Sequence, residues 1–188
     1  MIKITKPSPL ILKAKKLTPE RFQPFGEIIE CEGKTPMSIN QGTTKRFDDL
    51  ALLDLETQNG RPAISIFKAS ARPQPILLEV MERHPLGSQA FYPLYDQAFM
   101  NQAYDGKWLV VVAKKDCSNP IDKSNLHAFI ATKNQGVNYA KNVWNHPLLV
   151  LHEQHDFIII DRKGRGINLE ECYFKTPIQI DFNLDGGF

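Results

Sequence analysis

The sequence predicts an all-β fold in which many short strands form a sandwich or barrel, with one or two short helices. Short apolar runs rich in Val, Ile, Phe and Trp recur along the chain, and such runs are typical of strands. The 13 prolines and 11 glycines interrupt the chain often, which indicates frequent turns. Helical periods are few, so the alternation of helices and strands that marks an α/β protein is not expected.

The first expected element is a short helix that begins at Thr18. Thr18 can cap the helix, Pro19 has the φ angle of a first helical position, and Glu20 suits the positive end of the helix dipole. Pro24 and Gly26 then end the helix after a short run.

The other expected elements are strands separated by turn-forming residues. The apolar runs that predict them are Ala63 to Phe67, Ile76 to Val80, Trp108 to Ala113, His127 to Ala131, Leu148 to Leu151 and Phe157 to Ile160. Ile178 to Phe182 alternates apolar and polar residues, which predicts a terminal strand that docks on its own barrel or on a partner's. The long connection from Tyr95 to Lys107 either covers a pocket or lengthens a surface hairpin.

Composition predicts one domain, residues 1–188, that acts on a small molecule. A chain of 188 residues, 42% of them hydrophobic, can bury one good core and is short for two domains. The 23 Lys and Arg against 21 Asp and Glu give a charge of +2 without a basic block, so we expect a small-molecule substrate and no nucleic acid.

Cysteine usage and the N-terminal stretch predict a cytoplasmic protein with no membrane partner. Cys31, Cys117 and Cys172 are odd in number and far apart, which argues against a disulfide framework and a structural zinc site. The only apolar run near the N-terminus is Leu10 to Leu12, which is too short for a signal peptide or a membrane span.

The segment from Leu78 to Phe91 is the richest in candidate chemistry. It is expected to form a strand, a turn and a second strand, and period-two geometry places Leu78, Val80, Glu82 and His84 on one face. If the two apolar residues mark the interior, Glu82 and His84 enter it about 7 Å apart along the backbone. They then form an acid/base pair or part of a metal site; otherwise they are rim residues where a strand leaves the core.

Two further segments carry polar side chains that could bind a ligand. Gln135 to Pro147 mixes amides, a phenol, an indole and an imidazole, so it either lines a cavity or is a polar loop with Trp144 in the core. In Ser38 to Leu50, Gly42 would let backbone amides approach an anion, and Arg46 could clamp a substrate carboxylate. Alternation also puts Arg46 beside Asp48, where a surface ion pair is the simpler interpretation.

These segments, in this order, resemble the ureidoglycolate lyase family, also called ureidoglycolate hydrolases. The resemblance runs from the Thr18 helix to about Arg162, and the run from Glu82 to Phe91 is its most specific part. The matching motifs are Ile39-Asn40-Gln41-Gly42, Asp49-Leu50-Ala51, Glu82 to Phe91, Gln135 to Tyr139, Val143-Trp144, His146-Pro147-Leu148, Asp156-Phe157 and Asp161-Arg162.

The resemblance implies a cupin-like double-stranded β-helix, a jelly-roll barrel, and a homodimer. It also implies that ureidoglycolate is cleaved to glyoxylate and urea in allantoin and purine catabolism. The reaction is an elimination: a base removes the hydroxyl proton, the carbonyl forms, the C–N bond breaks, and an acid protonates the departing nitrogen. No redox cofactor is required, although a divalent ion could bind the carboxylate and hydroxyl.

Carried over residue by residue, the resemblance assigns roles to candidate site residues. His84 or His146 would move the protons, Glu82 would orient His84, and Arg46 would hold the carboxylate. The expected substrate-binding side chains are those of Asn40, Arg46, Asp48, Ser88, Gln89, Asn138, Tyr139 and Trp144.

The sequence departs from the family at three positions that commonly hold histidine, namely Asp48, Ala140 and Asn145. Histidine is a common metal ligand and the usual proton carrier near neutral pH. The sequence therefore requires no cofactor, and a weak divalent-metal site made by Glu82 with two histidines, His84 and His146, is the alternative. The same departures leave two other hypotheses open: a cupin-type enzyme for another small hydroxy or amido acid, and a binding protein without catalysis.

Overall fold

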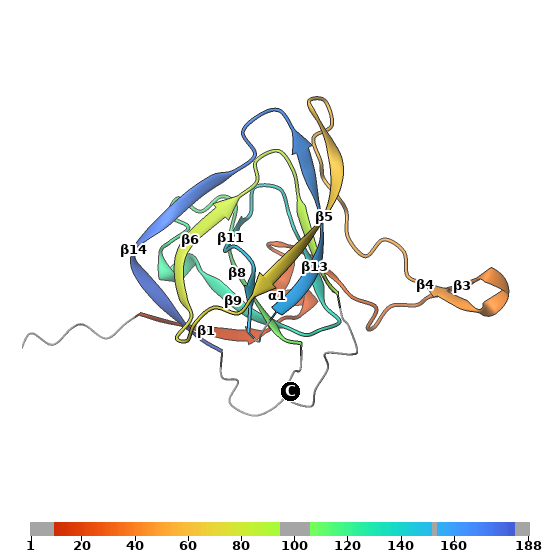
Figure 1. The fold of residues 1–188 in the computed structure, drawn as a ribbon, viewed down its shortest axis with the longest axis horizontal. Helices are drawn as coiled ribbons and strands as arrows, with labels where there is room; N and C mark the ends of the chain where they lie inside the picture. Colours follow the sequence, from red (N-terminus) through yellow and green to blue (C-terminus); the bar gives the residue numbers. More distant parts are fainter. Residues whose placement is uncertain (1–9, 95–105, 152–153, 183–188) are drawn as a thin grey trace, which may run out of the picture.

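A computed structural model describes residues 10–94, 106–151 and 154–182 of the 188-residue chain, and nearly all of its regular structure is β (Figure 1). The strands and helices, in chain order, are β1 (Ile11–Lys16), α1 (Pro19–Phe22), β2 (Gly26–Ile29), β3 (Met37–Ile39), η1 (Asn40–Gly42), β4 (Thr44–Arg46), β5 (Gly60–Ser70), β6 (Leu77–Arg83), β7 (Gln89–Leu94), β8 (Trp108–Ala113), η3 (Lys123–Asn125), β9 (His127–Ala131), β10 (Gly136–Tyr139), β11 (Trp144–Asn145), β12 (Leu149–Val150), β13 (Gln154–Gly164) and β14 (Glu170–Asp181). The expected long connection from Tyr95 lies outside the described residues up to position 105.

Two sheets build the body of the molecule. The seven-stranded sheet has the order β11-β6-β14-β1-β9-β8-β12, and β11 also pairs with β8, so part of this sheet closes on itself. The five-stranded sheet has the order β2-β10-β7-β13-β5. β1 runs parallel to β14 and β9, whereas the other described pairs are antiparallel. The predicted all-β, cupin-like barrel is confirmed.

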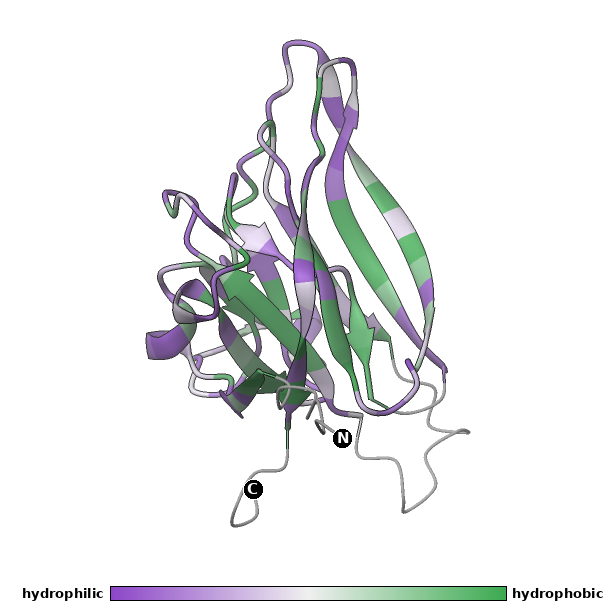
Figure 2. Cartoon of the chain, turned by 90° about the vertical axis from the view of Figure 1, so that its left-hand side faces the viewer, coloured by the Kyte–Doolittle hydropathy of each residue, from purple (hydrophilic) through white to green (hydrophobic). Residues whose placement is uncertain are grey.

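The core consists of two apolar clusters on the two faces of β8 and β9. Alternate residues of β8, from Trp108 to Val112, face the five-stranded sheet, where they join Phe91 and Phe157. The other residues of β8, from Leu109 to Ala113, belong to the second cluster, which the closed part of the larger sheet surrounds. In Figure 2 the central strands are accordingly largely apolar, and the polar residues lie mainly in the loops.

The predicted strands from Trp108 to Ala113 and from His127 to Ala131 coincide with β8 and β9. The predicted strands at 63–67 and 157–160 are the middles of β5 and β13, which pair antiparallel with each other over 11 residues although they are far apart in the sequence. The predicted strand at 148–151 is shorter, and only Leu149–Val150 pairs, with β8. The predicted terminal strand is the end of β14 and docks on its own barrel, beside β1 and β6.

The predicted helix is confirmed as α1, with Thr18 at its N-cap and Pro19 in its first turn. Its Phe22 side chain is fully buried and packs against Phe25, Phe129 and Tyr139. None of the helices in the described ranges has the length and apolar character needed to cross a bilayer.

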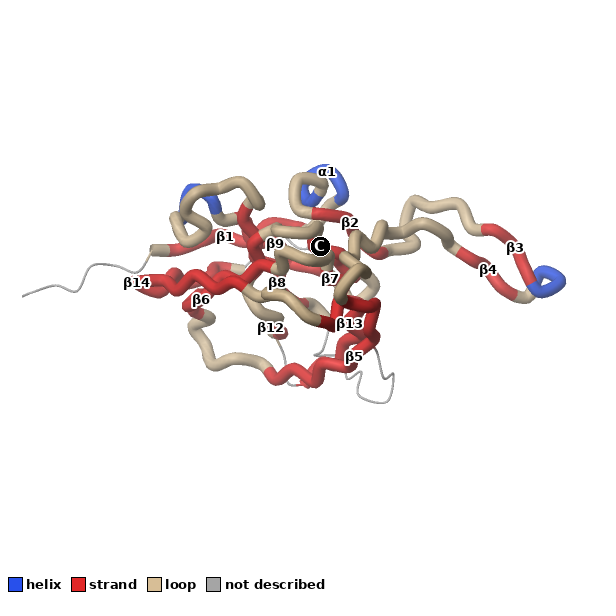
Figure 3. The backbone as a smooth tube through the Cα atoms, turned by 90° about the horizontal axis from the view of Figure 1, so that it is seen from above, coloured by secondary structure: helices blue, strands red, loops and turns tan. Residues whose placement is uncertain are grey.

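A two-stranded hairpin projects away from the barrel. β3 and β4 pair only with each other among the described strands, and we call the segment Met37–Arg46 the arm. Figures 1 and 3 show it standing clear of both sheets. At its tip, Asn40, Gln41 and Gly42 have left-handed backbone angles, with φ of 52°, 58° and 89°.

Candidate functional site

One cavity of about 840 Å³ is lined by residues of β6 on one side and of the paired strands β5 and β13 on the other. Polar and apolar residues share its lining, as expected of a small-molecule site. The lining residues are Ile66, Phe67, Lys68, Ala69, Glu82, His84, Gln89, Phe91, Pro147, Leu148, Asp161, Arg162, Lys163, Asn168 and Leu169. Three of the predicted site residues, Glu82, His84 and Gln89, are therefore brought together.

Glu82 and His84 reach the cavity through an irregular strand, and the predicted alternation along β6 is wrong in detail. Leu78 and Met81, three residues apart, are both fully buried in the same cluster, whereas Val80 is partly exposed. The partner strand β14 shifts its register between Tyr173 and Ile178, which adds a bulge that a period-two pattern does not anticipate.

A backbone carbonyl orients the His84 imidazole. Nδ1 of His84 lies 2.6 Å from the carbonyl oxygen of Asn168, so Nδ1 carries the proton and donates it. The Asn168 side chain holds the same loop in place, because its Oδ1 accepts a hydrogen bond of 2.8 Å from the Leu86 N–H. Nε2 of His84 is buried and has no hydrogen-bond partner in the described part of the chain, so it is the nitrogen left for proton transfer.

Glu82 lies beside this free nitrogen, with Oε1 at 3.9 Å from Nε2 of His84. That separation is longer than a hydrogen bond, so the orienting role predicted for Glu82 belongs instead to Asn168. Burial raises the pKa of Glu82, while nearby His84 and a 3.3 Å hydrogen bond from Asn145 act in the opposite direction. The raised pKa favours the protonated carboxyl, which can act as an acid.

The remaining polar lining is dominated by ion pairs. Arg162 donates from Nε and Nη2 to the Glu56 carboxylate, with a shortest distance of 2.6 Å, and its side chain is only 1% exposed. Lys163 lies 3.8 Å from Asp161, and Lys68 lies 3.4 Å from Asp156.

Some of these polar atoms have no hydrogen-bond partner among the described residues. The buried Oε1 of Gln89, Oδ1 of Asp161 and Nη1 of Arg162 lack hydrogen-bond partners, as Nε2 of His84 does. Unpaired buried polar atoms are costly, so their concentration around one cavity indicates a polar ligand.

Ser88 and Asn138, which were predicted to bind substrate, hold the segment around Leu52 and Asp54 against the five-stranded sheet. The Asp54 N–H donates to Oγ of Ser88 at 3.0 Å, and the Ser88 N–H donates to the Asp54 carbonyl at 2.8 Å. Nδ2 of Asn138 donates to Glu27 and to the Leu52 carbonyl, both at 2.9 Å. Neither residue is in the cavity lining.

Tyr139 and Trp144 are core residues. Tyr139 is 5% exposed and packs edge-on against Phe91, with ring centres 5.5 Å apart. Trp144 belongs to the second apolar cluster, and the Arg83 guanidinium lies 4.6 Å from the centre of its ring. Of the two interpretations of this segment, the structure favours the one in which the indole fills the core.

His146 is buried next to the cavity, and its neighbour Pro147 is in the lining. Nδ1 of His146 lies 2.7 Å from the Pro147 carbonyl, to which it donates. Burial lowers the pKa of His146 to about 4, so the ring is neutral near pH 7. Of the two histidines proposed as proton carriers, only His84 lines the cavity.

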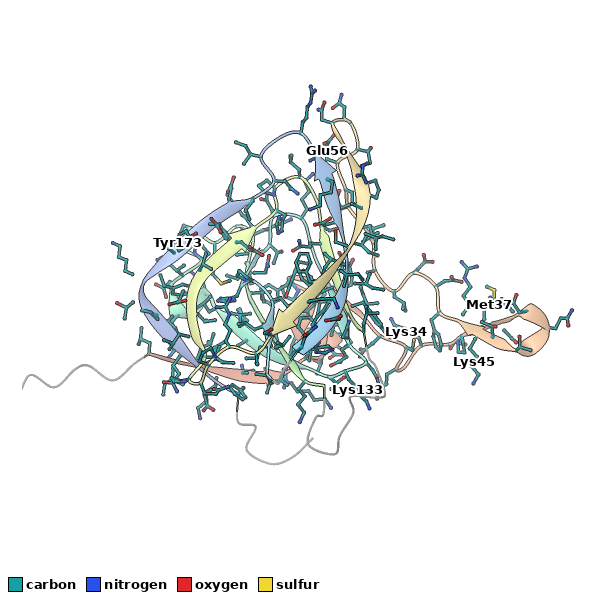
Figure 4. The ribbon with its side chains drawn as sticks, viewed as in Figure 1. Lys34, Met37, Lys45, Glu56, Lys133 and Tyr173 are labelled. Atoms are coloured by element: carbon teal, nitrogen blue, oxygen red, sulfur yellow. The ribbon has the colours of Figure 1, made fainter. Side chains whose placement is uncertain are left out.

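The other predicted substrate-binding residues, Asn40, Arg46 and Asp48, lie on the arm or directly after it. Arg46 donates from Nε to the Asp48 carboxylate at 2.6 Å, and both side chains are exposed. Figure 4 labels Met37 and Lys45 on this segment, far from the barrel wall. Within one chain, the structure does not bring these residues to the cavity.

The donor atoms of the predicted weak metal site do not converge. Across residues 10–94, 106–151 and 154–182, no three His, Cys, Asp or Glu side chains form a group that could hold a metal ion. Glu82 and His84 are neighbours, but His146 directs Nδ1 at a backbone carbonyl. We therefore derive no step through a metal.

Two site residues were not predicted. Asn145 donates a hydrogen bond to Glu82 and belongs to the polar segment before Leu148. From the sequence it was named only as a position at which the family commonly has histidine. Asn168 follows the basic turn at 162–166 and acts partly through its backbone carbonyl, which leaves no signal in a sequence.

Comparison with known proteins adds an independent finding. The family profile described as ureidoglycolate lyase matches residues 9–181. A ureidoglycolate lyase of Burkholderia mallei is 45% identical over 160 residues, which cover 85% of this chain and 87% of that protein. Its counterpart in Brucella anthropi is 45% identical over 163 residues, 87% of this chain and 89% of the relative. One from Burkholderia cepacia is 43% identical over 172 residues, which cover 92% and 91% of the two chains.

Proposed function

This chain belongs to the ureidoglycolate lyase family, and from that premise we propose that it cleaves ureidoglycolate to glyoxylate and urea in the cavity beside β6. The observation that carries the mechanism is the proximity of Glu82 and His84 in the cavity lining, where Oε1 of Glu82 lies 3.9 Å from Nε2 of His84. The Asn168 carbonyl holds the imidazole through its other nitrogen, Nδ1.

His84 acts as the base and Glu82 as the acid. Nε2 of His84 takes the proton of the substrate hydroxyl, the C–O bond becomes a carbonyl, and the C–N bond breaks. The Glu82 carboxyl, which its raised pKa helps to keep protonated, gives its proton to the departing nitrogen. Glyoxylate and urea leave, and the proton on His84 then returns to the adjacent Glu82 carboxylate.

The cavity also offers partners to the ureido group. The buried Oε1 of Gln89 lacks a donor, and a ureido N–H can supply one. Nη1 of Arg162 lacks an acceptor, which a substrate oxygen can provide. Such contacts place the scissile C–N bond beside the acid/base pair rather than contributing to the proton transfers.

The function is tested by incubating the purified protein with ureidoglycolate and following glyoxylate, urea and ammonia separately. Release of glyoxylate and urea in equal amounts is expected. Ammonia without urea would indicate hydrolysis instead. Absence of turnover, with or without added divalent ions, would rule out the lyase and leave a different substrate or a binding function.

The role of His84 is tested by His84→Ala, which we expect to lower kcat by at least about 100-fold because proton transfer is lost. Near wild-type activity in this variant would remove His84 from the mechanism. A suitable control is Ile167→Ala, because Ile167 is 77% exposed and outside the cavity lining.

We also propose that the reaction takes place in the cytoplasm. The three cysteines, Cys31, Cys117 and Cys172, are all free, which suits a reducing compartment. Cell fractionation with detection of the protein in the cytoplasmic fraction tests this proposal.

A further inference from the structure

We propose that the arm of one copy of this chain lies along the β5 edge of a second copy and completes the partner's cavity with Asn40 and Arg46. The substrate-binding role given to these residues rests on the proposed function, whereas the assembly itself does not. Four observations support the inference.

The first observation is the exposure of the arm. An isolated two-stranded hairpin is marginally stable in water unless a hydrophobic face packs against something. Every residue of the arm except Ile39 is exposed, and Met37 keeps 57% of its surface. Asn40 and Gln41 nevertheless hold left-handed angles, a strained conformation that persists where surrounding structure enforces it. Within one chain no described sheet packs against the arm, which points to a contact with a second molecule.

The second observation is an uncovered edge and face on the same molecule. β5 pairs with β13 on one side and forms no ladder with any other described strand on its second side. Its outward residues Ile64 and Ile66 are 74% and 51% exposed. The register places Ile66 in a row with Ile158 and Tyr92, so the apolar stripe continues across the sheet.

Long exposed edges with apolar residues are covered in natural proteins because they otherwise promote aggregation. Because Ile66, Phe67 and Lys68 also line the cavity, whatever covers the β5 edge also lies at the cavity mouth.

The third observation is charge. In the described part of the cavity lining, each Lys and Arg already contacts a carboxylate, whereas no Lys or Arg contact is found for Glu82. An anionic substrate beside Glu82 therefore needs another cation. The arm contains Lys45 and Arg46 and no acidic residue. Asp48 engages Arg46 through Nε, which leaves the two terminal nitrogens, Nη1 and Nη2, to bind a carboxylate end-on.

The fourth observation is size. A volume of about 840 Å³ is in the range of pockets for drug-sized ligands, which is roughly 300–1,000 Å³, and ureidoglycolate is much smaller. The tip of the arm would occupy the surplus and exclude water from the reacting groups.

A second copy is the occupant that accounts for all four observations. One chain carries both the projecting arm and the uncovered edge. In a dimer with a two-fold axis, the arm of each chain can therefore lie on the β5 edge of the other, and no arm is left exposed. Each of the two sites would then contain Glu82 and His84 from one chain and the arm of the other.

The assembly is tested first by sedimentation equilibrium. The wild type is expected at twice the chain mass of 21.4 kDa. Replacing residues 37–46 with a Gly-Ser linker of the same length should weaken dimerisation at least about tenfold. A monomeric wild type, or an unchanged dimer without the arm, would overturn the proposal.

The shared site is tested with mixed dimers purified through two different tags. A dimer of one His84→Ala chain and one Arg46→Ala chain has one intact site, so it should show about half the wild-type rate, although both parent homodimers are nearly inactive. A dimer of a wild-type chain and a chain carrying both substitutions should be nearly inactive, because each site lacks one group. If the sites lie within single chains, the two results are exchanged, which refutes the proposal.

Cross-linking tests the same contact without any assay of activity. In a Cys31→Ser background, which removes the exposed cysteine, one tagged chain carries Lys45→Cys and the other Lys68→Cys. A short bis-maleimide should link the two tags, and Lys175→Cys in place of Lys68→Cys provides a control on the distant strand β14. Absence of the mixed product would contradict the placement of the arm. A cross-link without ureidoglycolate cleavage would retain the assembly and discard the proposed function.

Discussion

Replacing Asn168 with alanine separates the positioning of His84 from the chemistry of His84 itself. The change removes Oδ1, which accepts the 2.8 Å hydrogen bond from Leu86, but leaves in place the backbone carbonyl that faces Nδ1 of His84 at 2.6 Å. The variant therefore acts through the loop: without its anchor, the segment that carries the carbonyl can move away from the imidazole.

Two magnitudes follow from these contacts. Loss of the acceptor for a partly buried N–H should lower the free energy of unfolding by about 1 kcal/mol. If the bond to Nδ1 contributes about 1 kcal/mol to holding the ring, its loss should lower kcat by up to about fivefold. KM should change little, because Asn168 is assigned to the orientation of the base rather than to substrate binding.

The assay is steady-state glyoxylate release, with urea denaturation of the same samples. Asn168→Asp retains the acceptor and should recover most of the lost stability, whereas Ile167→Ala on the same loop should resemble the wild type in both measurements. An Asn168→Ala variant that is destabilised as expected but keeps kcat within about twofold would show that the orientation of His84 does not limit the reaction.

Three further predictions concern Glu82, His146 and metal ions. Glu82→Gln should lower kcat about 100-fold or more and remove the alkaline limb of the pH–rate profile. The reason is that activity requires the protonated carboxyl, whose pKa is raised by burial. A retained alkaline limb would exclude Glu82 as the acid. Because the pKa of His146 is lowered to about 4 in the folded protein, the unfolded chain binds this proton at a higher pH than the folded chain does. His146 alone should therefore lower the free energy of unfolding by about 2 kcal/mol between pH 7 and pH 5, and His155, whose pKa is also lowered to about 4, adds to the drop. His146→Gln should flatten that part of the dependence in urea-denaturation experiments, and an unchanged slope would contradict the assignment. Dialysis against EDTA, checked by elemental analysis, should leave the lyase rate unchanged, whereas recovery only with a divalent ion would show that a metal takes part.

The sequence predicts best those elements whose pattern does not depend on a partner strand. β8 and β9 were placed correctly because both of their faces are buried, and a continuous apolar run marks such strands wherever they pair. β1 was not predicted, since only Leu12 and Ala14 of its six residues are buried and lysines occupy the positions between and after them.

The candidate site was predicted in residue type rather than in arrangement. Glu82 and His84 were identified, but the side of β6 on which each residue lies could not be predicted from the β6 sequence, because the bulge belongs to the opposite strand, β14. Asn138 and Ser88 carry polar groups that suit a ligand equally well, yet both bond to backbone atoms of the 52–54 segment, and Asn138 also donates to the Glu27 carboxylate. Only the three-dimensional structure shows which polar groups form hydrogen bonds within the protein and which face the cavity.

The double burial of β8 has a consequence for how the molecule opens. Its six residues contribute alternately to the two apolar clusters, so neither cluster can lose its packing without exposing one face of the same strand. Partial openings that spare one half of the barrel are therefore disfavoured, and we expect the β8 amides to be among the slowest to exchange with deuterated water, at a rate set by global unfolding. The amides of the arm should be among the fastest to exchange. In a lone chain they should exchange within the dead time of the exchange experiment, and contact with a second copy should slow their exchange.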